Sequence, residues 1–288
     1  MIARAAADAV GITAVADPIP ATVMVLSRNS AATLREALDS VVDFAEIIVC
    51  DGGSTDDTIG VARRAGARVI DQDPRFQDAT GRLRDYAGAR LQVVEAASQP
   101  WVLHLDADER ATPDLVAALR VVAETSEPAA YRCTAHHLVD GTSVASAANY
   151  PMWYLRFFHR DSVTGYLGPI NERPEFAEGV PVRDLDESFL IPMPPLRAVL
   201  RKWARYQRIV LADGRHRSPA EWWREERPRR WREVRWLAWR VWKSRRAEPG
   251  PHMPLRYDVA RVGFHLAGMV SSGLGACLPV GRMNGGHR

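Results

Sequence analysis

The sequence predicts an α/β fold with a Rossmann-like mixed, mostly parallel sheet flanked by helices, followed by a helical C-terminal appendage. Short apolar runs alternate with amphipathic segments from residue 22 to about residue 130, which is typical of strands joined by crossover helices. Near the C-terminus the chain becomes rich in arginine and tryptophan. With 288 residues, 47% hydrophobic and 25% charged, the composition excludes a disordered chain and a polytopic membrane protein.

Strands and helices are expected in alternation along the first half of the chain. The helix at 31–44 has Leu34, Leu38, Val41 and Val42 on one face, and a capping box at Ser54 and Asp57 is expected to open the next helix. Predicted strands cover 22–27, 46–50, 67–70, 101–105, 131–139 and 153–160, with a long helix at 79–97 and an irregular loop at 165–176.

Ligands of open α/β sheets bind beyond the carboxyl ends of the strands. Polar residues follow three of the predicted strands, in the segments 27–29, 51–57 and 106–109. Ser27 and Asn29 belong to the first of these segments. We therefore expect all three segments to face one crevice.

The acids of the last segment predict a metal site. Asp106 and Asp108 stand one residue apart after a strand, so both can reach one hard cation such as Mg²⁺ or Mn²⁺. Such a cation would bridge nucleotide phosphates and neutralise a departing diphosphate. The alternative is that Asp108 and Glu109 occupy the first turn of the following helix, where acids suit the helix dipole.

Asp51 ends the second predicted strand, just before two glycines. Its carboxylate can accept hydrogen bonds from a base or a ribose in the crevice. The alternative is an Asx-turn that only shapes the loop.

Taken together, the ordered motifs resemble the nucleotide-sugar-binding half of the inverting family-two glycosyltransferases, which have the GT-A fold. The matching stretches are VLSRN at 25–29, IIVCDGGSTDDT at 47–58, LRDYA at 83–87 and LDADER at 105–110, and the likeness covers about residues 20–180. Within the family the chain is most similar to the lipopolysaccharide-core glucosyltransferase type, which has LDADE here and a later strand like LRFF at 155–158.

The resemblance implies roles for individual residues. Asp51 would contact the nucleobase, Asp106 the ribose or the metal, and Asp108 the metal that holds the diphosphate. Arg84 would reach a phosphate from a helix, although Asp85 stands where the family usually has Asn.

A carboxylate is needed to take the proton of the acceptor hydroxyl during inversion. Relatives carry HisGlu after the LRFF-like strand, and this chain has Asn171 and Glu172 there, so Glu172 is the expected base. The alternative for Glu172 is a salt bridge with Arg173 or Arg156. The segment 184–187 is the reserve candidate, and the HisTyr-like pair that relatives often show beyond it is absent.

The segment 221–246 holds six of the nine tryptophans and ten basic residues against four glutamates. Trp231, Val234, Ala238, Val241 and Trp242 share a predicted helical face, which is typical of a helix lying in a membrane interface. The alternatives are a basic helix packed on the catalytic domain and a nucleic-acid patch, although we expect no nucleic-acid partner. The uncharged segment 262–280 suits shallow insertion rather than a span.

These observations predict a flexible leader at 1–20, a catalytic domain at 21–195 and a membrane-associating tail at 196–288. Within the catalytic domain the nucleotide-sugar half covers about 21–125 and the acceptor half about 126–195. The three scattered cysteines favour a reducing compartment. We expect a cytoplasmic enzyme, peripherally bound to the inner face of the cell membrane.

The expected reaction moves one sugar from a nucleotide-sugar donor, a UDP-sugar, to a lipid-linked or envelope glycan acceptor. A nucleotidyltransferase is the alternative enzyme. Such an enzyme needs a glycine-rich, lysine-bearing phosphate loop near the first strand, and SRNS at 27–30 is not such a loop. A non-catalytic membrane-bound scaffold with a degenerate version of the fold is the alternative outside enzymes.

Overall fold

A computed structural model of the chain describes residues 17–79, 81–125, 127–167, 172–214, 218–247 and 249–277. They form two compact units. One comprises the chain up to Thr134 together with Trp153–Phe189, and the other comprises Ala135–Met152 together with the chain from Leu190. The domain boundaries inferred from the sequence remain a prediction.

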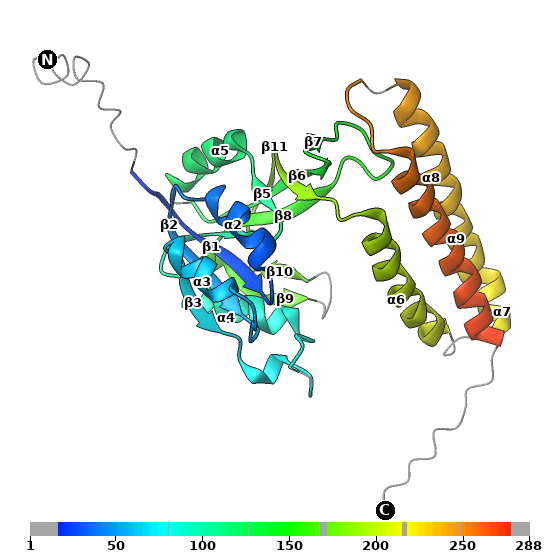
Figure 1. Cartoon of the computed structure of the whole chain (residues 1–288), viewed down its shortest axis with the longest axis horizontal. Coiled ribbons are helices and arrows are strands. Elements are labelled where there is room, and N and C mark those ends of the chain that lie inside the picture. The colour runs from blue at the N-terminus through cyan, green and yellow to red at the C-terminus, as the bar shows by residue number, and fades with distance from the viewer. Residues whose placement is uncertain are drawn as a thin grey trace, which may run out of the picture. The chain divides into compact units, whose positions relative to one another are not determined.

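The sheet is mixed, and its described strands run in the order β3-β2-β1-β4-β8-β6-β11-β5, with β7 paired to β6 (Figure 1). The first four in this order are parallel to one another, whereas β8 joins β4 antiparallel and β6 joins β8 antiparallel. The strands are β1 Ile19–Ser27, β2 Phe44–Asp51, β3 Arg68–Asp71, β4 Trp101–His104, β5 Arg110–Ala111, β6 Ala130–Val139, β7 Thr142–Ser143, β8 Trp153–His159, β9 Val163–Leu167, β10 Arg173–Phe176 and β11 Val182–Pro192.

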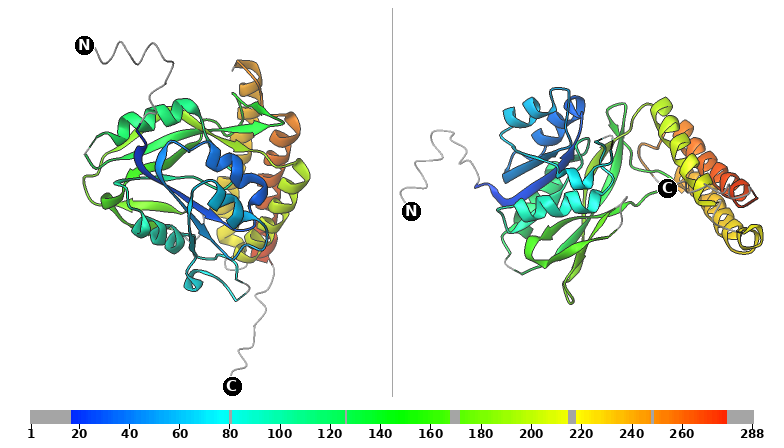
Figure 2. Two further views of the ribbon diagram at one scale, coloured as in Figure 1. Left: turned by 60° about the vertical axis from the view of Figure 1, so that its left-hand side comes forward. Right: turned by 90° about the horizontal axis from the view of Figure 1, so that it is seen from below.

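Helices cover both faces of the parallel half, as the alternating sequence pattern predicts. Because right-handed crossovers run from β1 to β2 to β3 and then back to β4, α2 and α3 lie on one face and α4 lies on the other (Figure 2). The helical segments of this unit are α2 Ala31–Asp39, α3 Thr58–Arg64, η1 Pro74–Phe76, α4 Tyr86–Ala96, α5 Pro113–Ala123 and η2 Arg160–Ser162. The predicted mixed α/β sheet with flanking helices is confirmed.

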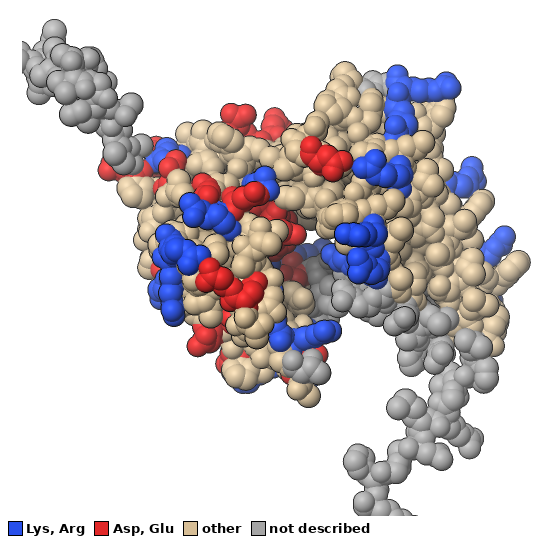
Figure 3. All heavy atoms as spheres, in the orientation of Figure 1, with Lys and Arg blue, Asp and Glu red and all other residues tan. Residues whose placement is uncertain are grey.

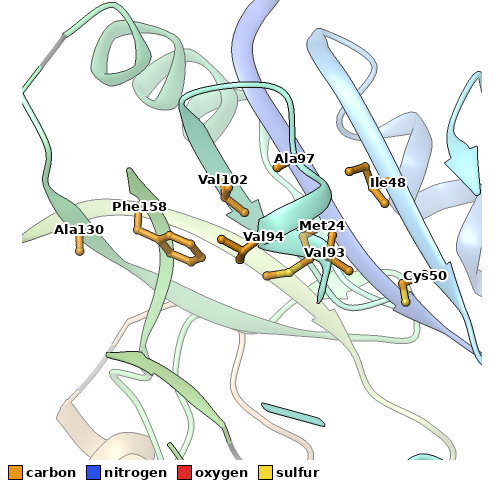
Figure 4. Packing of buried hydrophobic residues seen from close by; sticks show 9 residues of the cluster. All are labelled: Met24, Ile48, Cys50, Val93, Val94, Ala97, Val102, Ala130 and Phe158. Carbon is orange, nitrogen blue, oxygen red and sulfur yellow. The ribbon is translucent and has the colours of Figure 1, made fainter. Parts of the chain in front are cut away.

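The core on the α4 side explains why the strands are continuous apolar runs. Side chains of three parallel strands meet Val93 and Val94 of α4, and Phe158 of β8 closes the cluster (Figure 4). Both faces of the parallel strands are covered, so apolar residues are favoured at successive positions.

A register shift interrupts the pairing of β8 with β6. Tyr131 pairs with Phe157 and Arg132 pairs with Leu155, so Arg156 is one extra residue on β8. Arg156, at the shift, is buried, and so are Phe157 and Phe158, whose pairing with β4 is regular. The shift thus coincides with a charged side chain that is buried within an apolar strand.

Several element boundaries differ from the sequence-based expectation. Helix α2 ends at Asp39, so Val42 is exposed rather than buried with the helix face. The expected capping box is also wrong, because the Ser54 hydroxyl donates to Asp51 and α3 begins only at Thr58. Strand β1 starts at Ile19, inside the predicted leader, whose residues 1–16 lie outside the described part.

The helix expected at 79–97 is shorter, because α4 begins at Tyr86. Upstream, Leu83 forms a bridge with Gln77 in a short antiparallel turn, and the Asp85 carboxylate caps α4 by accepting from the Gly88 N–H at 2.9 Å. The irregular loop expected at 165–176 contains an antiparallel pair instead, formed by β9 and β10. Sequence periodicity missed the Gln77–Leu83 turn and the β9–β10 pair because the paired segments are too short to show a period.

The second unit is mainly helical. Its helical segments are α6 Leu196–Gly214, α7 Pro219–Glu221, a π-helical turn at Trp222–Glu226, α8 Arg227–Ala247 and α9 Leu255–Cys277. A small core joins Val139, Tyr150, Val199, Met253 and Tyr257. No helix among the described residues is long and apolar enough to cross a membrane.

The predicted exposed face of α8 is wrong in detail. Val234 and Leu237 are buried, whereas Trp231 and Trp242 are about half exposed. The physical reason is that α8 packs on α9 with its aliphatic residues, so its tryptophans lie on the outer side. The segment 262–280 is helical as far as Cys277, and residues 278–280 lie outside the described part.

Candidate active site

Three loops meet at the carboxyl edge of the parallel strands. Ser27 pairs with Asp51 at the ends of β1 and β2, and Met24 of β1 pairs with His104 at the end of β4. The Gly52 N–H also donates to the Ser27 carbonyl oxygen at 2.8 Å. The three polar segments expected at this edge therefore follow neighbouring strand ends.

The loop after β2 is organised by Asp51 and Asn29. The Asp51 Oδ2 accepts from the N–H groups of Gly53 and Ser54 at 2.9 and 2.7 Å, which is an Asx-turn. The Asn29 Oδ1 accepts from the Thr55 N–H at 2.7 Å, and the Asn29 backbone N–H donates to the Ser54 hydroxyl at 2.8 Å. Both residues thus shape the loop, and the nucleotide contacts expected of them stay predictions.

Asp106 lies among three nitrogen-bearing side chains. Its Oδ1 is 2.6 Å from the Arg90 Nη2 and 3.3 Å from the His104 Nε2, and its Oδ2 is 3.6 Å from the Arg156 Nη2. Burial alone would raise the pKa of Asp106, but Arg156, His104 and Arg90 together hold it well below its usual value. Burial and the two arginines also lower the pKa of His104, so His104 is neutral near pH 7.

Glu109 turns inward beneath Asp106. Its Oε1 accepts from the Arg156 Nη2 at 2.7 Å, and its Oε2 accepts from the Asp106 N–H at 3.0 Å. Burial raises the pKa of Glu109 to about 7, although Arg156 opposes the shift. Helix α5 starts only at Pro113, with Thr112 as its cap, so the alternative that Glu109 decorates a helix start is wrong.

Glu172 reaches the same cluster from the segment before β10. The Arg90 Nε donates to the Glu172 Oε1 at 3.1 Å, and only 9% of the glutamate side chain is exposed. Arg90 therefore bridges Glu172 and Asp106. The salt bridge considered for Glu172 exists, but its partner is Arg90 rather than Arg173 or Arg156. Asn171, the preceding residue of the predicted motif, lies outside the described residues.

The other candidates lie differently. Asp108 is exposed at the turn after Asp106. Arg84 is exposed too, and precedes α4 instead of lying on it, with its N–H donating to the Phe76 carbonyl. In the reserve segment 184–187, which lies within β11, Asp184 pairs with Arg132 at 2.6 Å. Among the carboxylates proposed as the base, only Glu172 is joined to Asp106 through a shared partner in the described structure.

Among the residues of the strand edge and of the cluster, four buried polar atoms lack a hydrogen-bond partner within the described structure. They are the Ser27 Oγ, the Arg90 Nη1, the Arg156 Nε and the Tyr166 hydroxyl. Buried donors without partners are costly, and in a binding site they are satisfied by the ligand or by water. This site therefore has spare donors for a ligand rich in oxygen atoms.

Asp106 and Asp108 are the residues that could hold a divalent cation. In the part of the chain that the structure describes, no three His, Cys, Asp or Glu side chains form a cage for a metal ion. Asp106, with 43% of its side chain exposed, and the exposed Asp108 can nonetheless offer two carboxylates from one turn. Mg²⁺ is commonly held by one or two carboxylates plus substrate phosphates, so this donor set fits such an ion.

Sequence reasoning missed Arg90, His104 and Glu109 as members of this cluster. Arg90 lies on α4, where the helix start was misplaced, so its direction could not be inferred. Arg156 carried a usable signal, since an arginine inside the apolar stretch LRFF needs a buried partner. The sequence around Glu109 gave no such signal, because acids that follow a strand are equally typical of a helix start.

Two curated relatives illustrate the likeness in sequence. The lipopolysaccharide core biosynthesis glycosyltransferase LpsC of Rhizobium meliloti is 33% identical over 92 residues, which cover 32% of this chain and 33% of LpsC. The succinoglycan biosynthesis protein ExoU of the same organism is 32% identical over 105 residues, covering 33% of this chain and 28% of ExoU. The matches thus span about a third or less of each relative.

Solved structures show a weaker likeness. TarS 1–349 of S. aureus in complex with UDP-GlcNAc has a TM-score of 0.42 at 14% identity, covering 61% of this chain and 59% of that one. Mannosyl-3-phosphoglycerate synthase from Rubrobacter xylanophilus has a TM-score of 0.42 at 21% identity, covering 63% and 69%. At such scores the classification rests on the sequence.

The family described as glycosyl transferase family 2 matches residues 22–171, which is more than half of the chain. This range begins in β1 and ends just before Glu172, so it includes the three strand-end loops, Arg90 and Asp106. It confirms the resemblance inferred from the ordered motifs: the chain belongs to glycosyl transferase family 2.

Proposed function

We propose that the protein is an inverting glycosyltransferase that moves one sugar from a nucleotide-sugar donor, a UDP-sugar, to a lipid-linked or envelope glycan acceptor. The observation that carries the proposal is the double contact of Arg90. One guanidinium touches both Asp106, at the strand edge where a donor would bind, and Glu172, the expected base. This shared contact supports a reacting centre that both proposed carboxylates could reach.

In the proposed reaction Glu172 acts as the general base. Its carboxylate takes the proton of the acceptor hydroxyl while that oxygen forms a bond to the anomeric carbon from the face opposite the diphosphate. The bond from the sugar to the diphosphate breaks, and its electron pair leaves with the phosphate oxygen. Arg90 holds the Glu172 carboxylate in place through a contact of 3.1 Å.

The donor would be held by groups at the strand edge. Asp51, Ser27 and Asn29 are proposed to contact the nucleoside, and Arg84 the phosphates. The partnerless Arg90 Nη1 is a second candidate donor to a phosphate oxygen. Bound by Asp106 and Asp108, a Mg²⁺ or Mn²⁺ ion would neutralise charge on the departing diphosphate.

The proposed location is the cytoplasmic side of the cell membrane. The second unit carries the arginine-rich segment 221–246, which anionic lipid would attract. Attachment there would bring the site near acceptors that are carried by lipids.

Replacement of the proposed base tests the reaction. Glu172→Gln keeps the size of the side chain but cannot take a proton, so transfer is expected to fall by about 10²–10⁴-fold. The matched control is Glu175→Gln, an exposed glutamate three residues further along, which should retain transfer. The measurement is the release of UDP from a panel of UDP-sugars with a membrane extract as acceptor source. Equal activity of Glu172→Gln and the control would exclude Glu172 as the base.

Calorimetry separates an enzyme from a scaffold. Wild-type protein titrated with UDP in the presence of Mn²⁺ should give heat that Asp108→Ala reduces, because one of two protein ligands is lost. Absence of metal-dependent nucleotide heat in the wild type would favour the non-catalytic alternative.

A further inference from the structure

The outward face of α8 is unusual for a helix in water. Trp231, Trp236, Trp239 and Trp242 are each between 46% and 53% exposed. Arg232 and Arg235 are exposed on the same side of the helix. We call these six residues the α8 belt. Since four half-exposed indoles present apolar surface on the order of 400 Å², the belt is as large as patches that usually mark an interaction site.

The belt carries the positive charges of Arg232 and Arg235, whereas Glu226 and Glu233 bind other arginines. Glu226 is buried and binds Arg229 and Arg230 at 2.8 and 2.6 Å, and Glu233 binds Arg229 at 3.0 Å. Within the described residues no carboxylate pairs with Arg232 or Arg235. In Figure 3 the outer edge of the C-terminal helices accordingly shows blue basic side chains separated by tan ones.

Near the C-terminal end of the belt, two tryptophan rings make cation–π contacts with basic side chains. The Lys243 Nζ lies 5.1 Å from the centre of the Trp239 ring, and the Arg246 guanidinium lies 4.9 Å from that of Trp242. Such cation–π contacts keep the positive charge next to the aromatic ring. A purely apolar face would instead place its charges on the opposite side.

This mixture matches one kind of partner. Tryptophan favours the headgroup level of a bilayer, where its ring is apolar and its N–H remains hydrated, and arginine binds the phosphates found at that same level. Protein interfaces are also rich in tryptophan and arginine but are depleted of lysine, so the Lys243 beside Trp239 favours lipid phosphates over a protein partner. We propose that the α8 belt lies flat on an anionic lipid surface, with its indoles among the headgroups and its guanidiniums on lipid phosphates.

The proposal deepens the membrane association given under Proposed function by assigning it to one helix face. It also corrects the face expected from the sequence, because Val234 is buried and takes no part. It depends only on residues of the second unit, so it stands whether or not Glu172 is the base.

Vesicle binding by the full-length chain tests the belt. Sedimentation with phosphatidylcholine vesicles, with and without phosphatidylglycerol, should show binding that requires the anionic lipid and weakens with salt. The double variant Arg232→Gln/Arg235→Gln should lower partition by roughly 30-fold, since each basic residue near the surface contributes about a factor of five. The matched control removes two exposed arginines of the first unit, as Arg35→Gln/Arg75→Gln, and should bind like the wild type.

A tryptophan variant separates the lipid surface from other polyanions. Trp236→Ala/Trp239→Ala should weaken vesicle binding, and the wild-type tryptophan fluorescence should be quenched by lipids brominated near the headgroup. The proposal is overturned if the arginine variant binds vesicles like its control. It is also overturned if a single-stranded oligonucleotide binds more tightly than the anionic vesicles and the same variants abolish that binding. Normal vesicle binding by Glu172→Gln would show that the two proposals are independent.

Discussion

Two pairs of arginines, one pair in each unit of the molecule, are used in opposite ways. In the first unit Arg90 and Arg156 are only 3% and 6% exposed, and each binds a carboxylate at 2.7 Å or less. In the second unit Arg232 and Arg235 point to solvent from α8. A buried guanidinium fixes the positions of the acids around it, whereas an exposed one remains available for a phosphate. The same residue type therefore organises a site in one unit and provides a surface in the other.

Removal of a buried arginine should have the largest effect on stability. Arg90→Met leaves Asp106 and Glu172 without their shared partner, so the free energy of unfolding should fall by about 3–5 kcal/mol. Urea unfolding of the variant measures this loss. The control is Arg84→Met, an exposed arginine nearby, which should stay within about 0.5 kcal/mol of the wild type. Similar losses in both variants would remove the contrast between buried and exposed arginines.

A buried histidine should make the second unit sensitive to acid. Burial and the nearby Arg261 lower the pKa of His137 to about 4, whereas an unfolded histidine titrates near its ordinary value. The unfolded chain therefore binds the proton first as pH falls, and stability that is complete above about pH 6.5 is lost toward pH 4. Between pH 7 and pH 5 this loss should be about 2 kcal/mol.

Urea unfolding at the two pH values checks this, with His137→Gln expected to show a smaller decrease than the wild type. The variant His159→Gln, from the first unit, serves as the comparison. If His137→Gln shows the same decrease in the free energy of unfolding as the wild type, another group causes the acid sensitivity of the protein.

The smallest effect is expected for the belt. The free energy of unfolding of Arg232→Gln/Arg235→Gln should match that of the wild type within about 0.5 kcal/mol, because neither guanidinium has a carboxylate partner in the described structure. A larger loss would mean that these arginines support the fold, and the division between organising and binding arginines would fail.

The strand edge could be predicted from the sequence because strong physical rules act there. Apolar runs predicted the positions of the strands. Because the carboxyl ends of parallel strands lie at one edge of the sheet, Ser27, Asp51 and Asp106 could be grouped from the sequence. Glu172 was singled out only through the family resemblance, since nothing in its own neighbourhood identifies it. Its contact with Arg90 joins residues 82 positions apart, which local patterns cannot reveal.

The limits of sequence reasoning are clearest at α4 and α8. In α4 the turn that pairs Gln77 with Leu83 displaces the helix start, so the helix predicted at 79–97 began too early. In α8 both sides of the helix carry large apolar residues, and the helical period alone cannot say which side packs on a neighbour. The aliphatic side is buried and the aromatic side is exposed.

The extra residue in β8 makes the length of this strand critical. If Arg156 were deleted, the register of β8 with β6 would become regular, and Glu109 would lose the guanidinium that now faces it. The acid turn would lose its counter-charge while the strand itself could still pair with β4 and β6. Homologues with a shorter β8 would therefore be expected to lack the buried glutamate as well.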